Sequence, residues 1–231
     1  MASSLIKGQV WQMRQIFPVI LFLLTCLLGP NDSSAQQRAV DKEFLDAVEH
    51  RDTARINATL ARGANVNAKE SINGHFALQY AINWPDENLV KLLLENGANV
   101  NLTDSLGDTA LIAAAGGAGP EYVKIVSLLL GHSADVHVAN DAAIFAAAKR
   151  AESEVLRMLI EKGASVNAKD NNQNGDTVLM AAATGGSAKK LQMLLAAGAD
   201  LKATNDDGQT ALMKAVQLQH SVSPADRLPM I

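Results

Sequence analysis

The chain has 231 residues, of which 48% are hydrophobic, 19% charged and 4% aromatic, and its formal net charge at pH 7 is −4. This composition is typical of a folded protein and excludes a disordered chain. A mildly acidic chain without long runs of like charge is a poor match for a nucleic-acid backbone or an anionic membrane. We therefore expect a folded protein that does not bind nucleic acid.

Residues 1–35 have the three-part pattern of a signal peptide. Two cations precede an uncharged apolar run over residues 16–28, and small residues lead to a predicted cleavage site between Ala35 and Gln36. The run is shorter than the roughly 20 residues that a membrane-spanning helix needs. We predict cleavage and export to the periplasm or the outside of the cell, with no membrane contact afterwards.

Two other interpretations of this segment stay open. An uncleaved segment would tether the protein to a membrane. Acylation would use Cys26, the single cysteine, but Leu27 and Leu28 prolong the apolar run beyond it. If the leader is removed, the mature chain contains no thiol, so its stability must come from packing.

A short linker over residues 36–40 is predicted to lead into a repetitive region. There the phrase Gly-Ala-polar-apolar, once with Ser in place of Gly, recurs with starts at Gly63, Gly97, Ser133, Gly163 and Gly198. A recurring period of about 33 residues indicates a solenoid of stacked units.

A second phrase precedes the first. Gly-x-Thr-Ala/Val-Leu occurs at 107–111, 175–179 and 208–212, with a degraded copy at 74–78. Apolar residues at helical spacing, such as Val90, Leu93 and Leu94, precede each Gly-Ala copy. Alanines also recur within the apolar segment that follows each Thr phrase. Their small side chains would permit neighbouring units to approach closely.

Together the two phrases resemble the ankyrin repeat. The resemblance implies an all-α solenoid in which the Thr begins a first helix, a second helix runs to Gly-Ala, and a β-hairpin finger follows. Within residues 41–220, the predicted units are 41–68, 69–102, 103–138, 139–168, 169–203 and a partial 204–220. Residues 221–231 are predicted to be a frayed tail.

The first unit lacks the Thr phrase but keeps an apolar pattern in phase, which is typical of a polar-faced cap. Its in-phase residues are Phe44, Ala47, Ile56 and Leu60.

Three departures from the repeat are visible. The turn around 116–120 carries extra residues, is expected to be mobile, and has Pro120 placed to begin the next helix. Between Val136 and Ala142 the finger is three residues short and has no glycine, so we expect this finger to be missing or collapsed and the groove beside it to be open. The next finger is lengthened at 171–174.

No motif of a known catalytic or phosphate-binding class is present, and we predict neither enzymatic activity nor a cofactor. His132, Asp135 and His137 suggest a metal site, but no further ligand is identifiable. We therefore interpret these three residues as occupying variable positions of the repeat. Asn57 and Asn101 match the glycosylation sequon and are interpreted as chance matches. Asp104, Asp170 and Asn205 occupy positions that in the ankyrin family bond backbone amides within the finger.

The resemblance implies a monomer that binds an unidentified protein partner on a concave face made of finger tips and first-helix ends. Phase assigns to this face His75, Asn83, Trp84, Ser105, Leu106, Asp108, Lys149, Arg150, Asp176, Thr184, Asp207 and Gln209, with the finger tip at 171–174. Trp84 is the strongest candidate because Trp is enriched among binding hot spots, although it is equally placed to pack over the turn at Pro85.

Two other functions remain open. One is an accessory protein that protects or inhibits a secreted enzyme or carries a metal. The other is a scaffold that self-associates through its weakly capped C-terminal end.

Overall fold

The structure, a computed structural model, describes residues 33–170 and 174–221, with side chains described up to residue 217. Within those ranges, no helix combines the length and the hydrophobicity needed to cross a membrane. The predicted apolar leader, the lengthened part of the finger at 171–173 and the tail at 222–231 lie outside the described residues.

The first described element is the helix α2 (Ser33–Glu49). The prediction of a linker over 36–40 was wrong, because these residues belong to α2. The segment contains only residues that tolerate a helix well and neither Gly nor Pro, so nothing in it ends the helix. Signal-peptide cleavage between Ala35 and Gln36 stays a prediction.

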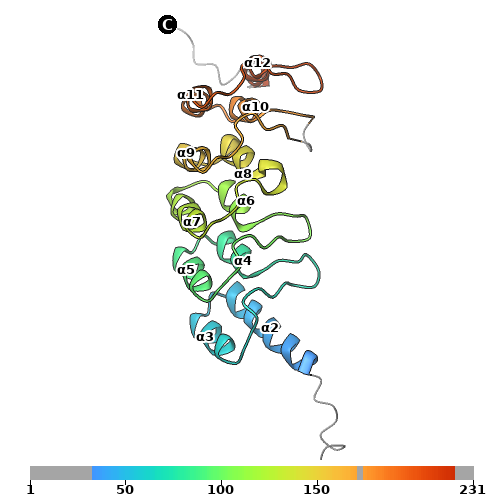
Figure 1. Ribbon diagram of the computed structural model, residues 1–231, viewed down its shortest axis with the longest axis vertical. Coiled ribbons are helices and arrows are strands. Elements are labelled where there is room, and N and C mark those ends of the chain that lie inside the picture. Colours follow the sequence, from blue (N-terminus) through green and yellow to red (C-terminus); the bar gives the residue numbers. More distant parts are fainter. Residues whose placement is uncertain (1–32, 171–173, 222–231) are drawn as a thin grey trace, which may run out of the picture. The chain divides into compact units, whose positions relative to one another are not determined.

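Short helices follow in pairs, each pair forming one repeat (Figure 1). After α2 come α3 (Thr53–Ala61), α4 (Ala77–Asn83), α5 (Glu87–Glu95), α6 (Ala110–Ala115), α7 (Pro120–Gly131), α8 (Val138–Lys149), α9 (Ser153–Glu161), α10 (Val178–Thr184), α11 (Ala188–Ala196) and α12 (Ala211–Ser221). Pro120 begins α7, as predicted, where its missing N–H costs nothing.

The helices stack in two layers. First helices pack on first helices in the order α4, α6, α8, α10 and α12, while second helices pack in the order α5, α7, α9 and α11. The alanines that face the next repeat, Ala81, Ala114, Ala147 and Ala182, are at most 1% exposed. Their small side chains allow the close approach predicted from the sequence, and the neighbouring leucines fill the layer between them. In the first unit Phe44, Ala47 and Ile56 are fully buried, as the phase predicted.

An asparagine after most Gly-Ala phrases ties each repeat to the next one. Asn67, Asn101 and Asn167 accept hydrogen bonds through Oδ1 from the amides of Asn99, Asp135 and Asp200, at 2.7, 2.8 and 2.8 Å. Each Nδ2 also donates to a carbonyl of the next repeat's turn, those of Gly97, Ser133 and Gly198. These bonds fix the spacing of the repeats on the finger side.

The third repeat has His137 in place of this asparagine. The amide of Ser165, which needs an acceptor, instead bonds to Oδ1 of Asp141 at 3.0 Å. Asp141 reaches that position because Ala139, Asn140 and Asp141 all adopt left-handed backbone conformations, with φ of 51°, 59° and 61°. The compact turn thus supplies the acceptor that an asparagine supplies at the other repeat junctions.

Three fingers are closed by single antiparallel β-bridges, Lys69 with Phe76, Thr103 with Thr109, and Lys169 with Thr177. In Figure 1 these loops project from the first-helix side, whereas the chain curls into a tight turn beside α8. The prediction that this finger is missing is confirmed. Its residues form the left-handed turn instead.

Two of the side chains predicted to organise the fingers, Asp104 and Asn205, make the expected bonds to backbone amides. Asp104 Oδ1 accepts from the amides of Leu106 and Asp108, both at 2.9 Å. Asn205 Oδ1 accepts from those of Asp207 and Gln209, at 3.2 and 2.8 Å. An amide and a carboxylate therefore serve the same structural purpose.

Candidate protein-binding surface

The missing finger leaves a groove of 580 Å³ on the first-helix side of the stack. One wall is the third finger with Leu106 and Asp108, and the other is the fifth finger with Asp170 and Asp176. The floor comes from α8 and α10 and includes Ala139, Asn140, Ala142, Phe145, Ala146, Ala181 and Thr184. The prediction that this part of the groove is open is confirmed.

The groove is lined by apolar side chains and by charged ones, with two cations at the end of α8. Leu106 is 86% exposed at the tip of its finger, and Phe145 is half-buried in the floor. Lys149 and Arg150 are exposed at the end of α8. A protein segment that carries an apolar side chain beside an acidic one would match both features.

The carboxyl of Asp108 lies on the finger wall. Burial, and then the nearby charge of Asp104, raise its pKa above the ordinary value. Burial also acts to raise the pKa of Asp104, but hydrogen bonds from Gln79 and from the amides of Asp108 and Leu106 outweigh it, and the pKa is lowered. Asp104 is therefore a structural group of the finger, and Asp108 contributes a partly buried carboxyl to the groove wall.

The position of Lys149 and Arg150 depends on how the last turn of α8 is held. Lys190, on α11, is 5% exposed, and its ammonium donates to the carbonyls of Ala147 and Ala148 at 3.0 and 3.1 Å. Gly185 approaches the same turn so closely that a Cβ would lie 2.6 Å from the carbonyl oxygen of Lys149. The fifth repeat therefore fixes the cationic end of the groove.

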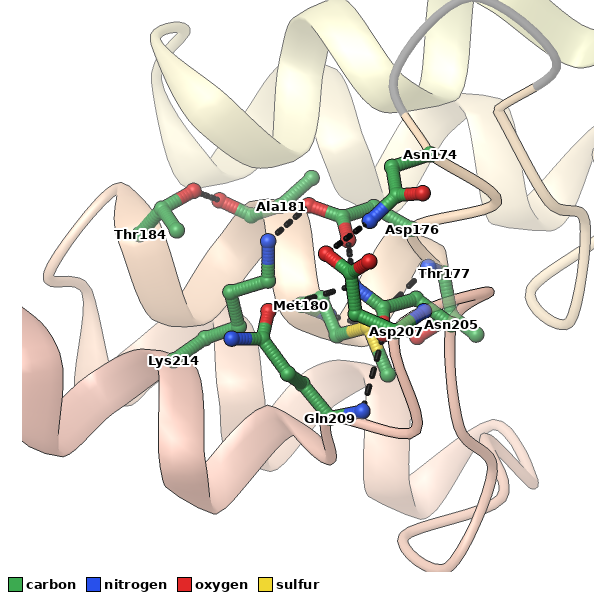
Figure 2. Close-up of polar contacts among 10 residues, drawn as sticks. All are labelled: Asn174, Asp176, Thr177, Met180, Ala181, Thr184, Asn205, Asp207, Gln209 and Lys214. Atoms are coloured by element: carbon green, nitrogen blue, oxygen red, sulfur yellow. Dashed lines mark hydrogen bonds and ion pairs between the residues drawn. The ribbon is translucent and has the colours of Figure 1, made fainter.

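Asp176 also lines the groove, but its charge is compensated within the protein. Figure 2 shows Lys214 extending from α12 to Asp176, with Nζ 2.9 Å from Oδ2. Nδ2 of Asn205 donates to Oδ1 of Asp176 at 2.7 Å. This ion pair is largely buried, so Asp176 joins the fifth repeat to α12.

Six of the residues predicted from repeat phase line this groove, and six do not. Those along it are Leu106, Asp108, Lys149, Arg150, Asp176 and Thr184. Those elsewhere are His75, Asn83, Trp84, Ser105, Asp207 and Gln209.

The residues outside the groove have local roles or are exposed. His75 makes an edge contact with Tyr80, with ring centroids 5.9 Å apart. The amide of Ser105 donates to the second finger, and Asp207 accepts a hydrogen bond from Asn174. Trp84 is 62% exposed beyond the end of α4, so the turn does not bury it.

The repeat pattern did not predict that Phe145 lies on this surface. It follows the buried Ile144 on α8, at a position where α6 has Ile112 and α10 has Met180. The signal that could have found it is the missing finger itself, because removing a finger exposes the first-helix residues that it would cover.

The two histidines of the metal hypothesis make other contacts. His132 Nδ1 lies 2.9 Å from the Leu128 carbonyl, and His137 Nδ1 lies 2.9 Å from Asp141 Oδ1. Across residues 33–170 and 174–221, no three His, Cys, Asp or Glu side chains converge as a metal site would require.

Comparison with known proteins agrees with the repeat geometry. The family model described as "Ankyrin repeats (3 copies)" matches residues 44–140, 102–170 and 143–223. The chain belongs to the ankyrin-repeat family. Ankyrin repeats form protein–protein interaction modules, and the family is generally non-enzymatic.

Relatives include much longer proteins. The chain is 31% identical over 170 residues to human Ankyrin repeat and SOCS box protein 6, which covers 69% of this chain and 39% of that protein. It is 37% identical over 89 residues to human 2-5A-dependent ribonuclease, 38% of this chain and 12% of the relative. The ankyrin-repeat chain thus spans well under half the length of these curated relatives.

A solved structure matches more completely. It is a chain in the complex titled "Bd0816 Predatory Endopeptidase from Bdellovibrio bacteriovorus in complex with immunity protein Bd3460". The TM-score is 0.67 and the sequence identity 28%, over 78% of this chain and 93% of that one.

Proposed function

We propose that this ankyrin-repeat protein holds a partner protein in the groove of its fourth repeat, outside the cytoplasm. The observation that carries the proposal is the 580 Å³ groove, in which an exposed leucine and a phenylalanine lie beside two exposed cations. Apolar anchors next to charged groups are the usual composition of a binding hot spot. Trp84 extends the candidate surface over the second repeat.

Charge reversal at the groove tests this proposal. Lys149→Glu/Arg150→Glu should reduce capture of the partner from the exported fraction at least tenfold, because acidic groups of the partner would meet like charges. Lys162→Glu/Lys189→Glu is the matched control, since both lysines are exposed and neither lines the groove. Equal loss in both variants, or none in the first, would remove the groove as the binding surface.

The extracytoplasmic location rests on the signal-peptide pattern of residues 1–35. We expect the mature protein in the periplasmic or secreted fraction with Gln36 as its first residue, which N-terminal mass spectrometry would identify. A full-length chain in the membrane fraction would instead support the tethered alternative.

A second, more specific candidate function is inhibition of a partner enzyme. It is favoured by the likeness to a chain in a complex of an endopeptidase with its immunity protein, because that match covers nearly the whole of the solved chain. If the captured partner is an enzyme, adding the purified protein should lower its activity, and Lys149→Glu/Arg150→Glu should restore that activity. A partner without enzymatic activity, or one whose activity is unchanged, would contradict this candidate.

A further inference from the structure

The fingers are joined to one another along the stack by backbone hydrogen bonds. The amide of Ser105, in the third finger, donates to the carbonyl of Asn73 in the second at 3.2 Å. The amide of Asp206, in the last finger, donates to the carbonyl of Asn174 in the fifth at 3.0 Å. The two bonds involve equivalent positions, because each acceptor directly precedes the glycine of its finger.

Leu106 is the equivalent acceptor of the third finger, since it precedes Gly107. The finger that would donate to it belongs to the fourth repeat, and there the chain forms the left-handed turn Ala139–Asp141. Among residues 33–170 and 174–221, no amide takes the place of that donor. The gap therefore offers a backbone acceptor, the 86% exposed Leu106 side chain and the floor residue Phe145.

We propose that the partner fills this gap with a tight turn of its own, which takes the place of the missing fourth finger. This inference rests on the proposed function and specifies the partner's binding segment. A backbone amide of the turn donates to the Leu106 carbonyl, as finger amides do elsewhere in the stack. An apolar side chain at its tip packs between Leu106 and Phe145, and an acidic side chain faces Lys149 and Arg150.

A protein turn suits this gap for a physical reason. Main-chain pairing needs only a free N–H, which any turn presents, and the apolar and cationic groups then select its side chains. A helix has already used its amides internally, except in its first turn, so it cannot pair with Leu106 along its length.

A grafted finger provides the direct test. In the graft variant, residues 137–141 are replaced by the eight-residue sequence of residues 101–108, which lengthens the segment by the three residues that it lacks. The graft also restores an asparagine at position 137, so the amide of Ser165 keeps an acceptor. We expect a folded protein with an unchanged or higher thermal midpoint and at least a tenfold loss of partner binding.

The control adds the same number of residues away from the fingers. Insertion of Gly-Ser-Gly after Arg51, in the turn between α2 and α3, should leave binding within twofold of the unmodified protein, because no residue of that turn lines the groove. If the grafted protein folds and keeps its partner while Lys149→Glu/Arg150→Glu loses it, the proposed function stands and the fourth-finger inference is wrong.

A probe of known sequence tests the gap without the natural partner. The probe is a peptide with the sequence of residues 102–110, closed into a hairpin by a disulfide between two added cysteines. We expect amide chemical-shift changes at Leu106, Asn140 and Phe145 that disappear in the graft variant. Absence of these changes, or equal changes in the graft variant, would overturn the inference. So would a homodimer that only the graft dissociates, because a second copy would then be the occupant.

Discussion

Lys190 is the residue on which the cationic end of the groove depends most directly. It is an almost fully buried lysine that donates to two carbonyls at the end of α8, where a helix leaves carbonyls without partners. Burial lowers its pKa below the ordinary value, and the nearby charge of Glu152 opposes that shift in part. The protein thus uses a desolvated cation to cap a helix of the preceding repeat.

Removing that cap should destabilise the stack. We expect Lys190→Met to lower the free energy of unfolding by about 1–3 kcal/mol, because two buried carbonyls lose their donors. Lys189→Met, at the exposed neighbouring position, should change it by less than about 0.5 kcal/mol. Urea unfolding measures both, and equal effects would show that the contact of Lys190 with α8 is unimportant.

The lowered pKa of Lys190 also predicts a pH dependence. The unfolded lysine titrates near 10.5, so between the folded and the unfolded pKa the unfolded chain binds more protons. The stability that Lys190 contributes therefore rises with pH up to about 10.5. The difference in unfolding free energy between the unmodified protein and Lys190→Met should be larger at about pH 10 than at about pH 7, and a constant difference would contradict this.

The hydrogen bonds that Asp104 accepts within its finger lead to a further prediction. Asp104→Ala should cost about 1–2 kcal/mol, because the amides of Leu106 and Asp108 lose their acceptor. Asp104→Asn should cost much less, since Asn205 makes the same two bonds in its own finger. Thermal unfolding of the two variants compares them, and equal losses would mean that the charge of Asp104 matters more than its acceptor oxygen.

At the scale of elements, the left-handed turn before the regular part of α8 is the unusual feature. It supplies Asp141 as the acceptor for the amide of Ser165, and it removes the finger that would cover Phe145. Ala139 adopts φ 51° and ψ 46°, a conformation that is unfavourable for residues with a Cβ. The groove is therefore opened by an element that carries local strain.

Relief of that strain is measurable. Ala139→Gly should raise the free energy of unfolding by up to about 1 kcal/mol, because glycine takes left-handed conformations readily. Ala146→Gly, in the right-handed part of α8, is the matched control and should lower it by about 1 kcal/mol. A destabilising effect of Ala139→Gly would indicate that the Ala139 side chain makes contacts worth more than the strain.

At the scale of the whole stack, burial falls at α12. Leu212 is 69% exposed, whereas its counterparts Leu78, Leu111, Ile144 and Leu179 in the preceding first helices are at most 1% exposed. The side chain of Val216, also on α12, is 46% exposed. The ion pair of Lys214 with Asp176 and the bonds of Asn205 are thus important in holding this helix (Figure 2).

This difference predicts uneven protection from hydrogen exchange. Backbone amides of α12 should exchange at least tenfold faster than those of α10, because opening α12 exposes little additional apolar surface. Lys214→Met should increase the exchange rate of α12 further and leave that of α6 unchanged. Equal protection of α10 and α12 in the unmodified protein would show that the stack opens as one unit.

Sequence alone determined the repeat period, the helix pairs and the missing fourth finger, because glycines, alanines and leucines at fixed spacing express local requirements of helices and turns. The repeat pattern also assigned Leu106, Lys149 and Arg150 to one face, and all three line the groove. Only the tertiary structure showed that Phe145 lines the same groove, that Lys190 caps α8 and that Asp176 is paired with Lys214. These contacts join residues some 40 positions apart in different repeats, where the direction of each side chain, and not its spacing along the chain, decides what it meets.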